Sequence, residues 1–421
     1  MKILVYPHDM NLGGSQLNAI ELAAAVKDLG YDVAVAGQHG SLRAKVGELG
    51  LEFIELPEPG RRPSRKVVSA LEQAIAQRGI DIVHGYEWPP SLEAELACFN
   101  APATAVSTVL SMSVAPFIPT HTPLLVGTEQ IAAAEREFGR ALVELMEPPI
   151  DTRLNRPGLE LPVREMSQRW GIHGGGLTIA IVSRLAREMK LEGILRAIEV
   201  IGRIPGGEPV QLVIAGGGPA AGEVAAAADE ANRRAGQLRV VLTGELEDPR
   251  WVYQKADIVL GMGGSILRAM AFGKPAVVQG ESGFWRVVDE SSLPGFLFQG
   301  WYGAGAGSGQ GADALQAQLR PLLADAALRQ RLGDFARRVV VERFSLQASA
   351  RRQVQFYRQV LAQGQGRNRL GAEYTLAAAR FARYKFSRLA ARMRGSVAAD
   401  DFNATAALRS AGAPGRPAVR A

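Results

Sequence analysis

The sequence predicts an α/β protein made of two doubly wound domains. Short apolar runs typical of buried strands alternate with helical patterns along most of the chain. The chain has 421 residues, and domains usually hold about 100–200 residues each. The alternation stops once, at a proline-rich segment, and then starts again. These three observations together predict two mainly parallel sheets.

The first domain is expected to span residues 1–150. Its first strand, residues 2–6, leads to a helix that ends at Gly30. Gly13 and Gly14 lie at the start of that helix, where a ligand can approach the backbone, although the third glycine of a dinucleotide fingerprint is missing. Further strands are predicted at 32–36, 52–56, 80–84, 103–109 and 124–127, with helices near 64–78, 91–98 and 129–138.

Residues 147–162 contain four prolines, which exclude a continuous helix and predict an interdomain linker. The second domain is expected at 151–345. Its strands are predicted at 177–182, 238–244, 258–260 and 275–278. Residues 210–219 are predicted to form a further strand followed by a glycine turn. Helices are predicted near 191–203, 220–235, 249–255, from Ser265, and at 312–324, 326–342 and 346–362. The glycine-rich segment 303–311 is expected to be a flexible surface loop.

The loop at 261–264 gives the first functional signal. It contains Gly261, Gly263 and Gly264, follows a buried strand and precedes a helix. A helix that opens in this way leaves backbone N–H groups without intrahelical partners at the positive end of its dipole, which suits a phosphate. A tight turn between a strand and a helix is the commoner explanation of a glycine cluster alone.

Composition excludes several classes of protein. The single cysteine, Cys98, excludes an internal disulfide framework and fits a reducing compartment. The first apolar run is broken by Pro7 and is typical of a strand rather than a signal peptide. No apolar stretch reaches the roughly 18 residues that a membrane span needs. We therefore expect a cytoplasmic protein, with a membrane-peripheral location as the alternative.

The positive charge of the chain lies in its tail. Residues 364–421 carry eleven Lys and Arg against three acidic residues, a net charge of +8, whereas the whole chain has a net charge of +6. The rest is therefore slightly acidic, which argues against a nucleic-acid partner. Residues 372–394 are helix-permissive and amphipathic. They either contact an anionic membrane surface or form part of a solubilising tail, and disorder is expected from Ala404 on.

Six segments carry a family resemblance. They are GGSQ at 13–16, PPIDTRLNRP with Asp151, IVSRLAREMKLEG with Arg184 and Lys190, LVIAGGGP, ILRAMAFGKPAVV, and the helices that end near 361. In this order they resemble a family 4 retaining glycosyltransferase of the GT-B fold, among the glycosyl transferases group 1. The resemblance covers roughly residues 1–361. It implies two Rossmann-like domains that face each other across a cleft.

The resemblance implies a nucleotide-sugar-dependent hexosyltransferase that acts with retention. Negative charge develops on the departing diphosphate, and fixed cations and helix-end amides stabilise such charge. Arg184 and Lys190 would neutralise the diphosphate, and the amides of Gly263, Gly264, Ser265 and Ile266 would complete its cradle. Without the resemblance, Arg184 and Lys190 are more simply explained as solvated surface cations.

The family also implies the remaining organisation of the chain. Residues 1–150 would form the acceptor side and 151–345 the nucleotide-sugar side, with helix 346–363 crossing back and 364–421 as a basic tail. The base and ribose would lie near 216–218 and 243–246. The resemblance implies no metal and no cofactor besides the donor, and the sequence contains no Asp-x-Asp motif.

Two departures from the family concern the donor sugar. The positions of its paired glutamates hold Leu260 and Arg268. Arginine cannot accept hydrogen bonds from ribose hydroxyls, but it can bind a phosphate or carboxylate; a surface salt bridge is the alternative. Glu281 is a candidate to restore a carboxylate, or else an exposed loop acid. The family's sugar-contacting histidine is replaced by the run Leu110, Ser111 and Met112.

His121 and His84 are the available substitutes for that histidine, although a lone histidine is more often structural. Glu87 and Trp88 are candidates for an acceptor pocket, with ordinary packing as the alternative. The leading hypothesis is therefore sugar transfer from a nucleotide-diphosphate donor to an unknown, lipid-linked or other acceptor. A catalytically inactive GT-B-like binding or scaffolding protein is the main alternative, and a sugar-nucleotide epimerase is a third.

Overall fold

A computed structural model describes residues 1–11, 13–204, 209–363 and 370–393. The described chain forms two compact units. Unit 1 comprises residues 1–149 and the described residues from Leu346 on, and unit 2 comprises residues 150–345. The chain therefore leaves unit 1 once and returns to it after unit 2.

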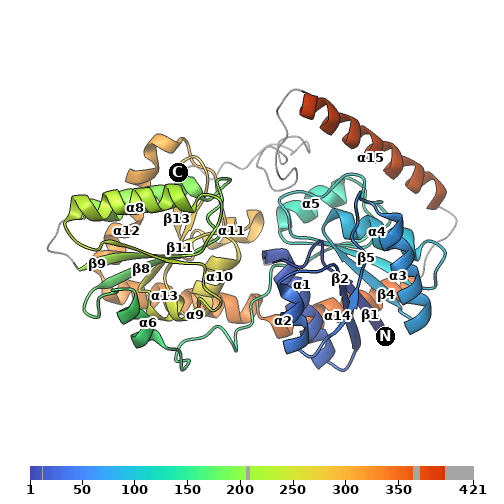
Figure 1. The fold of residues 1–421 in the computed structure, drawn as a ribbon, viewed down its shortest axis with the longest axis horizontal. Helices are drawn as coiled ribbons and strands as arrows, with labels where there is room; N and C mark the ends of the chain where they lie inside the picture. The colour runs from blue at the N-terminus through green and yellow to red at the C-terminus, as the bar shows by residue number, and fades with distance from the viewer. Residues whose placement is uncertain (12, 205–208, 364–369, 394–421) are drawn as a thin grey trace. The chain divides into compact units, whose positions relative to one another are not determined.

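Unit 1 is built on a seven-stranded parallel sheet of order β3-β2-β1-β4-β5-β6-β7 (Figure 1). The first strand in the chain lies at the centre, so connections run outward from it in both directions, as in doubly wound folds. The strands are β1 (Lys2–Tyr6), β2 (Asp32–Gly37), β3 (Glu52–Glu55), β4 (Ile82–Tyr86), β5 (Thr104–Val109), β6 (Leu124–Val126) and β7 (Val143–Leu145).

Helices cover both faces of this sheet because its central strands are apolar on both sides. Ile3 and Val5 of β1 face one core, and Leu4 and Tyr6 face the other. Each fully buried aliphatic side chain contributes about 1.5–3 kcal/mol to folding. The helices are α1 (Gly14–Asp28), α2 (Leu42–Glu48), α3 (Arg65–Arg78), α4 (Trp88–Cys98), α5 (Glu129–Glu137), α14 (Leu346–Gln363) and α15 (Leu370–Met393).

The last two helices both belong to unit 1. Helix α14 packs against α1, and its buried Phe356 and Tyr357 enter the core on that face of the sheet. Helix α15 lies along the outside of the unit beside α4 and α5 (Figure 1). Residues 364–369 and 394–421 of the predicted basic tail lie outside the described residues, including the segment from Ala404.

Unit 2 has a six-stranded sheet of order β10-β9-β8-β11-β12-β13. All pairs are parallel except β12 with β13, which is antiparallel. The strands are β8 (Leu177–Val182), β9 (Val210–Ala215), β10 (Val240–Gly244), β11 (Ile258–Gly261), β12 (Ala276–Gln279) and β13 (Trp285–Val287). The α/β class predicted from the sequence is thereby confirmed.

The helices of unit 2 also pack on both faces of its sheet. Ile179 and Ile181 of β8 face the core shared with α7, α8 and α12, whereas Ala180 faces α9 and α10. The helices are α6 (Val163–Arg169), α7 (Leu191–Gly202), α8 (Ala221–Ala235), α9 (Arg250–Lys255), α10 (Gly264–Ala271), α11 (Leu293–Gln299), α12 (Gly311–Ala324) and α13 (Ala326–Arg343), with a short 3₁₀ turn η1 (Ser308–Gln310).

The sequence predicted a flexible surface loop at 303–311, and this prediction is wrong for residues 303–307. Glu281 donates its N–H to the Gly303 carbonyl at 3.0 Å, and Gly305 donates back to the Glu281 carbonyl at 2.9 Å. Gly307 donates to Ser282 at 3.0 Å. Backbone hydrogen bonds therefore hold this segment against the residues that follow β12. The glycines allow the two backbones to approach closely, and they do not make the segment flexible.

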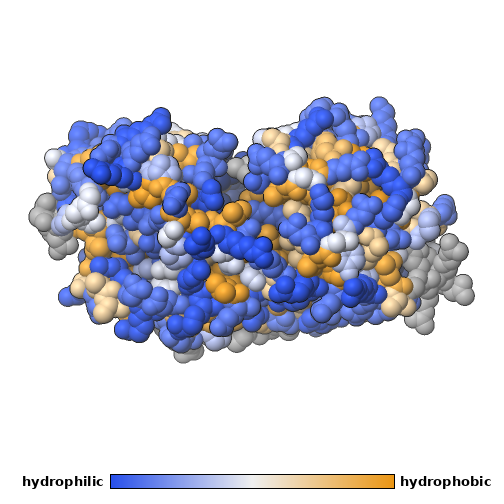
Figure 2. Space-filling model, turned by 90° about the horizontal axis from the view of Figure 1, so that it is seen from below, coloured by the Kyte–Doolittle hydropathy of each residue, from blue (hydrophilic) through white to orange (hydrophobic). Residues whose placement is uncertain are grey.

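No helix of the described residues is long and apolar enough to cross a membrane. On the face drawn in Figure 2, apolar residues form separate patches among hydrophilic ones in both units. Scattered apolar residues of this kind are normal on folded proteins and need no partner to explain them.

Candidate functional site

The strand order of unit 2 has a switch point at the carboxyl ends of β8 and β11. Strand β8 leads through α7 to β9 on one side, whereas β11 leads through α10 to β12 on the other. The loops after these two neighbouring strands diverge, and ligands of doubly wound sheets bind at such a switch point. Both predicted phosphate-binding segments lie on these loops.

The loop from β8 to α7 carries Arg184 and Lys190. Arg184 is exposed and Lys190 is half-buried at the N-cap of α7. Burial lowers the pKa of Lys190, and the neighbouring Arg184 charge lowers it further. In the described parts of the chain neither side chain has an acidic partner. The structure thus brings the two predicted cations together, and no acidic side chain of the described residues neutralises them.

The backbone of this loop is held in a specific shape. Met189 has φ of 62°, a left-handed conformation that costs energy for any residue except glycine. The loop also lies against the glycine turn after β9. A Cβ atom on Gly216 would lie 1.9 Å from the Ser183 carbonyl oxygen, and one on Gly218 would lie 2.6 Å from that of Leu185. These glycines allow the turn to support the Arg184 loop.

The loop from β11 to α10 presents two backbone donors. Gly263 has φ of 57° and donates its N–H to the Trp301 carbonyl at 2.8 Å. Ile266 donates to the Gly263 carbonyl at 3.1 Å. Among the described residues, the N–H groups of Gly264 and Ser265 have no protein acceptor. Of the four amides predicted to hold a phosphate, Gly264 and Ser265 are therefore the ones available for it.

Arg268 lies over the start of the same helix. A Cβ atom on Gly264 would lie 3.4 Å from Nη1 of Arg268, so the guanidinium is beside the first turn. Burial raises the pKa of Tyr253, and Arg268 is near enough for its charge to oppose that rise. No described acidic residue pairs with Arg268. The salt bridge considered from the sequence is absent from that part of the chain.

Leu260 and Glu281 occupy different environments. Leu260 is fully buried between neighbouring strands and packs in the core of unit 2. Glu281 follows β12 at the carboxyl edge, and its backbone pairs with Gly303 and Gly305. Burial and the Glu281 charge raise the pKa of Tyr302 to about 12. Glu281 is therefore close to Tyr302, and the position of Leu260 offers no polar group to a ligand.

Unit 1 does not bring His121 to the carboxyl edge of its sheet. His121 precedes β6 by three residues, and Nε2 lies 2.6 Å from Oε1 of Glu95 near the end of α4. Its ring also contacts Tyr374 of α15. Because the residues before a parallel strand lie at its amino end, His121 is on the edge opposite Glu87. The predicted catalytic role is not supported by this position.

His84 is buried in the core of unit 1. Its ring nitrogens lie 2.6 Å from the Tyr357 hydroxyl and 2.6 Å from Oγ1 of Thr108. Burial lowers its pKa to about 3, so the imidazole is neutral at physiological pH. With no exposed surface, His84 joins α14 to the sheet rather than contacting a sugar.

Glu87 is a functional candidate that the sequence indicated only weakly. It is the first residue after β4, has φ of 66°, and is largely buried. Its carboxylate accepts hydrogen bonds from the Ser15 hydroxyl at 2.9 Å, the Leu110 N–H at 3.1 Å and the Ser111 hydroxyl at 2.7 Å. One carboxylate therefore ties together three segments at the switch point between β1 and β4.

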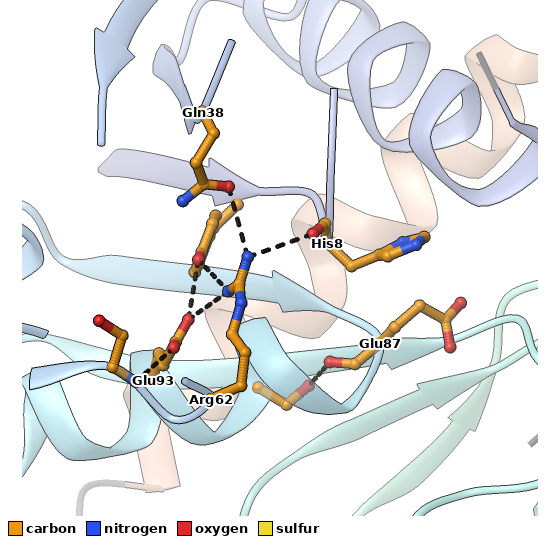
Figure 3. Close-up of polar contacts among 8 residues, drawn as sticks. His8, Gln38, Arg62, Glu87 and Glu93 are labelled. Atoms are coloured by element: carbon orange, nitrogen blue, oxygen red, sulfur yellow. Dashed lines mark hydrogen bonds and ion pairs between the residues drawn. The ribbon is translucent and has the colours of Figure 1, made fainter. Parts of the chain in front are cut away.

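Beside Glu87, a buried ion pair organises the same edge of unit 1 (Figure 3). Arg62 Nη1 lies 2.5 Å from Oε2 of Glu93, whose side chain is fully buried. The guanidinium also donates to the Tyr6 hydroxyl at 2.6 Å and to the Gln38 side chain at 3.4 Å. A buried pair of this kind is costly to break by removing one partner, so it fixes the loop before α3.

Gly13 and Gly14 open α1 at this edge, and Gly13 is extended with φ of −160°. The Nε2 atom of the nearby His8 lies 3.0 Å from Asp9. Burial acts to lower the pKa of His8, but the hydrogen bond and charge of Asp9, with the charge of Glu87, raise it overall. Unit 1 therefore presents a polar rim that contains His8, Glu87 and Ser111.

Trp88 belongs to an aromatic cluster rather than to this rim. Its ring contacts Phe117 at a centroid distance of 5.4 Å, and Phe381 and Tyr384 of α15 at 6.1 Å each. Packing, the alternative considered from the sequence, thus accounts for its position. In the linker, Asp151 accepts N–H bonds from Arg153 and Leu154 and shapes a turn. No group of three metal-ligating side chains occurs among the described residues.

Residues 176–323 match the family model of glycosyl transferases group 1. A glycosyltransferase from Rickettsia africae matches with a TM-score of 0.68 and 14% identity, covering 86% of this chain and 99% of that one. Anabaena HepE in complex with UDP gives 0.66 and 15% identity, covering 84% and 99%. Sucrose-phosphate synthase from Thermosynechococcus elongatus gives 0.65 and 17% identity, covering 86% and 100%. No curated protein matches the sequence.

These structures share the fold at low identity, and the family match coincides with the sheet that holds Arg184, Lys190 and the 261–264 loop. The resemblance inferred from the six sequence segments is confirmed. This chain has the GT-B fold with two Rossmann-like domains, and its residues 176–323 match the glycosyl transferases group 1 family.

Proposed function

We propose that this protein transfers a sugar from a nucleotide-diphosphate donor, whose diphosphate binds at the carboxyl edge of the unit 2 sheet. The enzyme class, glycosyltransferase, rests on the family match over 176–323. The donor class is supported by HepE, solved with UDP, with UDP and glucose, and with UDP-glucose. Uridine diphosphate sugars are therefore the first donors to test.

One observation carries the proposal. Arg184 and Lys190 lie together after β8, where burial and mutual repulsion disfavour the charged ammonium. The neighbouring strand β11 ends in a loop whose Gly264 and Ser265 amides have no acceptor among the residues that the structure describes. A diphosphate would neutralise the cations and accept from the amides, and such fixed positive groups stabilise a departing anion.

Arg268 gives this site a third cation in place of a glutamate. The arginine cannot accept bonds from ribose hydroxyls, but its N–H donors suit phosphate oxygens. We assign it to the diphosphate rather than to the ribose. Arg184 and Lys190 would then lower the activation barrier for departure of the nucleoside diphosphate. Arg268 and the Gly264 and Ser265 amides would fix the position of this leaving group.

The acceptor side is assigned to unit 1. Its polar rim at Glu87, His8 and Ser111 lies at the switch point of that sheet, where ligands of such folds bind. We propose a cytoplasmic, membrane-peripheral enzyme with retention of anomeric configuration and a lipid-linked acceptor. The last assignment rests on the amphipathic helix α15, considered below.

A thermal-shift screen of nucleotide sugars against nucleoside diphosphates tests the donor assignment. A ligand that binds only the folded protein raises its melting temperature. At a ligand concentration a hundredfold above Kd, the free energy of unfolding increases by about 2.7 kcal/mol. We expect one nucleoside diphosphate and its sugar conjugates to shift the melting temperature, and the free nucleoside to shift it little. No shift with any diphosphate would exclude the proposed site.

A catalytically inactive binding protein is the second candidate, favoured by the buried, apolar Leu260 and by Arg268 at the two glutamate positions. The two functions differ in turnover rather than in binding. Release of nucleoside diphosphate from the donor selected by the screen, with water or a sugar acceptor, supports the enzyme. Tight donor binding with no turnover across lipid-linked and soluble acceptors supports the inactive protein.

A further inference from the structure

We propose that α15 is a membrane-docking helix, which attaches unit 1 to an anionic lipid surface through a stripe of exposed apolar residues bordered by cations. This outer stripe consists of Ala379, Ala382, Phe386, Leu389 and Met393. The proposal concerns attachment and does not depend on the sugar-transfer reaction.

One face of α15 is fixed to unit 1. Phe381 and Tyr384 contact Phe117 at ring-centroid distances of 5.1 and 4.9 Å. Tyr374 donates a hydrogen bond to Oε1 of Glu95 at 2.7 Å, and Arg380 lies over the ring of Phe138 at 4.6 Å. These contacts hold the helix as a structured part of unit 1, so its orientation on the unit is defined.

The opposite face has no partner among the described residues. The outer stripe repeats at intervals of three and four residues, which places its members along one side of a helix. Phe386, Leu389 and Met393 have exposed fractions of 73, 54 and 78%. Three large apolar side chains next to each other on one exposed helical face mark an interaction surface.

Cations border the outer stripe on both sides. At about 100° per residue, Arg383 lies roughly a quarter turn to one side, and Lys385 and Arg392 lie roughly a quarter turn to the other. All three are exposed. The acidic residue in the described part of the helix, Glu373, is on the docked side and accepts a hydrogen bond from Thr120. The charged side chains that border the outer stripe in the described part of the helix are therefore all basic.

This charge pattern selects the partner. Two copies of the chain that paired through their outer stripes would bring like charges together, which opposes association. An anionic bilayer instead accepts the apolar side chains at its acyl boundary and attracts the flanking Lys and Arg to its headgroups. Long basic side chains reach the headgroups while their stems cover apolar surface.

Vesicle flotation of the full chain tests the proposal. One vesicle preparation contains phosphatidylcholine alone, and the other contains phosphatidylcholine with phosphatidylglycerol. We expect flotation with the anionic vesicles only, and weaker flotation as salt concentration rises. Binding to both vesicle types alike, or to neither, would overturn the proposal.

Two variants separate the apolar and the charged contributions. The apolar variant is F386S/L389S/M393S, and the charge variant is R383E/K385E/R392E. Because each basic residue near an anionic surface contributes about a factor of five in binding, the charge variant should lose at least about 100-fold. The control R320E/R331E/R338E makes the same change in net charge on exposed arginines of α12 and α13, and should bind as the unaltered chain does.

The variants also decide against other partners. All substituted side chains are exposed, so melting temperatures should stay close to that of the unaltered chain. If the apolar variant floats normally, the outer stripe does not bind lipid and the proposal is wrong. The proposal is equally wrong if the apolar variant converts a dimer to a monomer in solution and the unaltered chain does not float.

Insertion can be observed directly with Met393→Cys. Cys98, the single native cysteine, is buried, so a thiol at 393 is the reactive one for an environment-sensitive dye. We expect a blue shift in its emission on anionic vesicles and none on neutral ones. A dye at Arg338→Cys on unit 2 should show no shift, and an equal shift at both sites would contradict docking through α15.

Discussion

Lys190 is a half-buried ammonium beside the guanidinium of Arg184, and both its burial and that neighbouring charge lower its pKa. The folded protein therefore binds this proton less tightly than the unfolded chain does. The resulting loss of stability is complete at pH values below the folded-state pKa, and it vanishes above the unfolded value near 10.5. Neutral pH lies below the unfolded value, so the destabilisation is present there.

Lys190→Met should therefore stabilise the ligand-free protein at neutral pH while abolishing function. We expect a higher melting temperature, loss of the shift caused by nucleoside diphosphate, and a fall in turnover of roughly 100-fold or more, since cations at a departing diphosphate act on the transition state. Differential scanning fluorimetry and a diphosphate-release assay measure these effects. Lys66→Met, on an exposed lysine of α3, is the control. A variant that keeps both diphosphate binding and turnover would remove Lys190 from the site.

Arg268→Met should weaken the binding of nucleoside diphosphate about tenfold, because a hydrogen bond to a charged group contributes roughly 1.5–3 kcal/mol. Affinity for the free nucleoside should not change, since the arginine is assigned to the phosphates. Titration calorimetry with both ligands measures the difference, with Arg320→Met as the matched surface control. Equal weakening of both ligands would instead place Arg268 beside the nucleoside.

His84 should make unit 1 sensitive to acid. Burial lowers its pKa from the ordinary value of 6.5 to about 3, so the folded state resists protonation. The stability that depends on neutral His84 is complete above pH 6.5. It declines as the pH falls from there towards 3, by at most about 1.4 kcal/mol per pH unit.

Urea denaturation of the unaltered chain and of His84→Gln between pH 7 and 4 tests this dependence. We expect the difference in unfolding free energy between the two proteins to shrink as the pH falls. Activity should not follow a protonation of His84 within the same range, because the ring is fully buried. A difference that is constant with pH would show that His84 titrates normally.

His8 should titrate above its ordinary pKa because the attraction to Asp9 and Glu87 outweighs the effect of burial. Asp9→Asn should lower the pKa of His8, and Glu87→Gln should lower it by less, since Asp9 also accepts a hydrogen bond from the His8 ring. An NMR titration of the imidazole protons measures both shifts. A larger fall in Glu87→Gln than in Asp9→Asn would contradict the contact between His8 and Asp9.

Local patterns in the sequence were sufficient for the architecture. Strands at 2–6 and 177–182 were predicted at their observed bounds because buried parallel strands leave continuous apolar runs. Short elements such as α2 and β13 were missed, since a helix of seven residues or a strand of three carries too little periodicity. The loop 303–311 was misjudged because composition does not show what a glycine backbone packs against.

The site was predictable only where a motif fixed the chemistry. Arg184 and Lys190 became candidates through the family resemblance, and their proximity is observed, whereas their role stays a prediction. The absence of an acidic partner for Arg268 among the described residues depends on tertiary packing, as does the pairing of Arg62 with Glu93. The position of His121 at the amino edge was not predicted, because a sequence does not show on which edge of a sheet a long loop ends.

The glycine segment beside β12 implies an unusual pattern of tolerance to substitution. A Cβ atom on Gly303 would lie 2.5 Å from the Phe284 ring, and one on Gly305 would lie 2.4 Å from the Ser282 carbonyl oxygen. Gly307 and Gly309 have open space around them. In a saturation-mutagenesis library, every replacement at 303 and 305 should be depleted, whereas positions 307 and 309 should accept most residues. Repetitive composition would then conceal two positions that cannot accept a side chain without a shift of their neighbours.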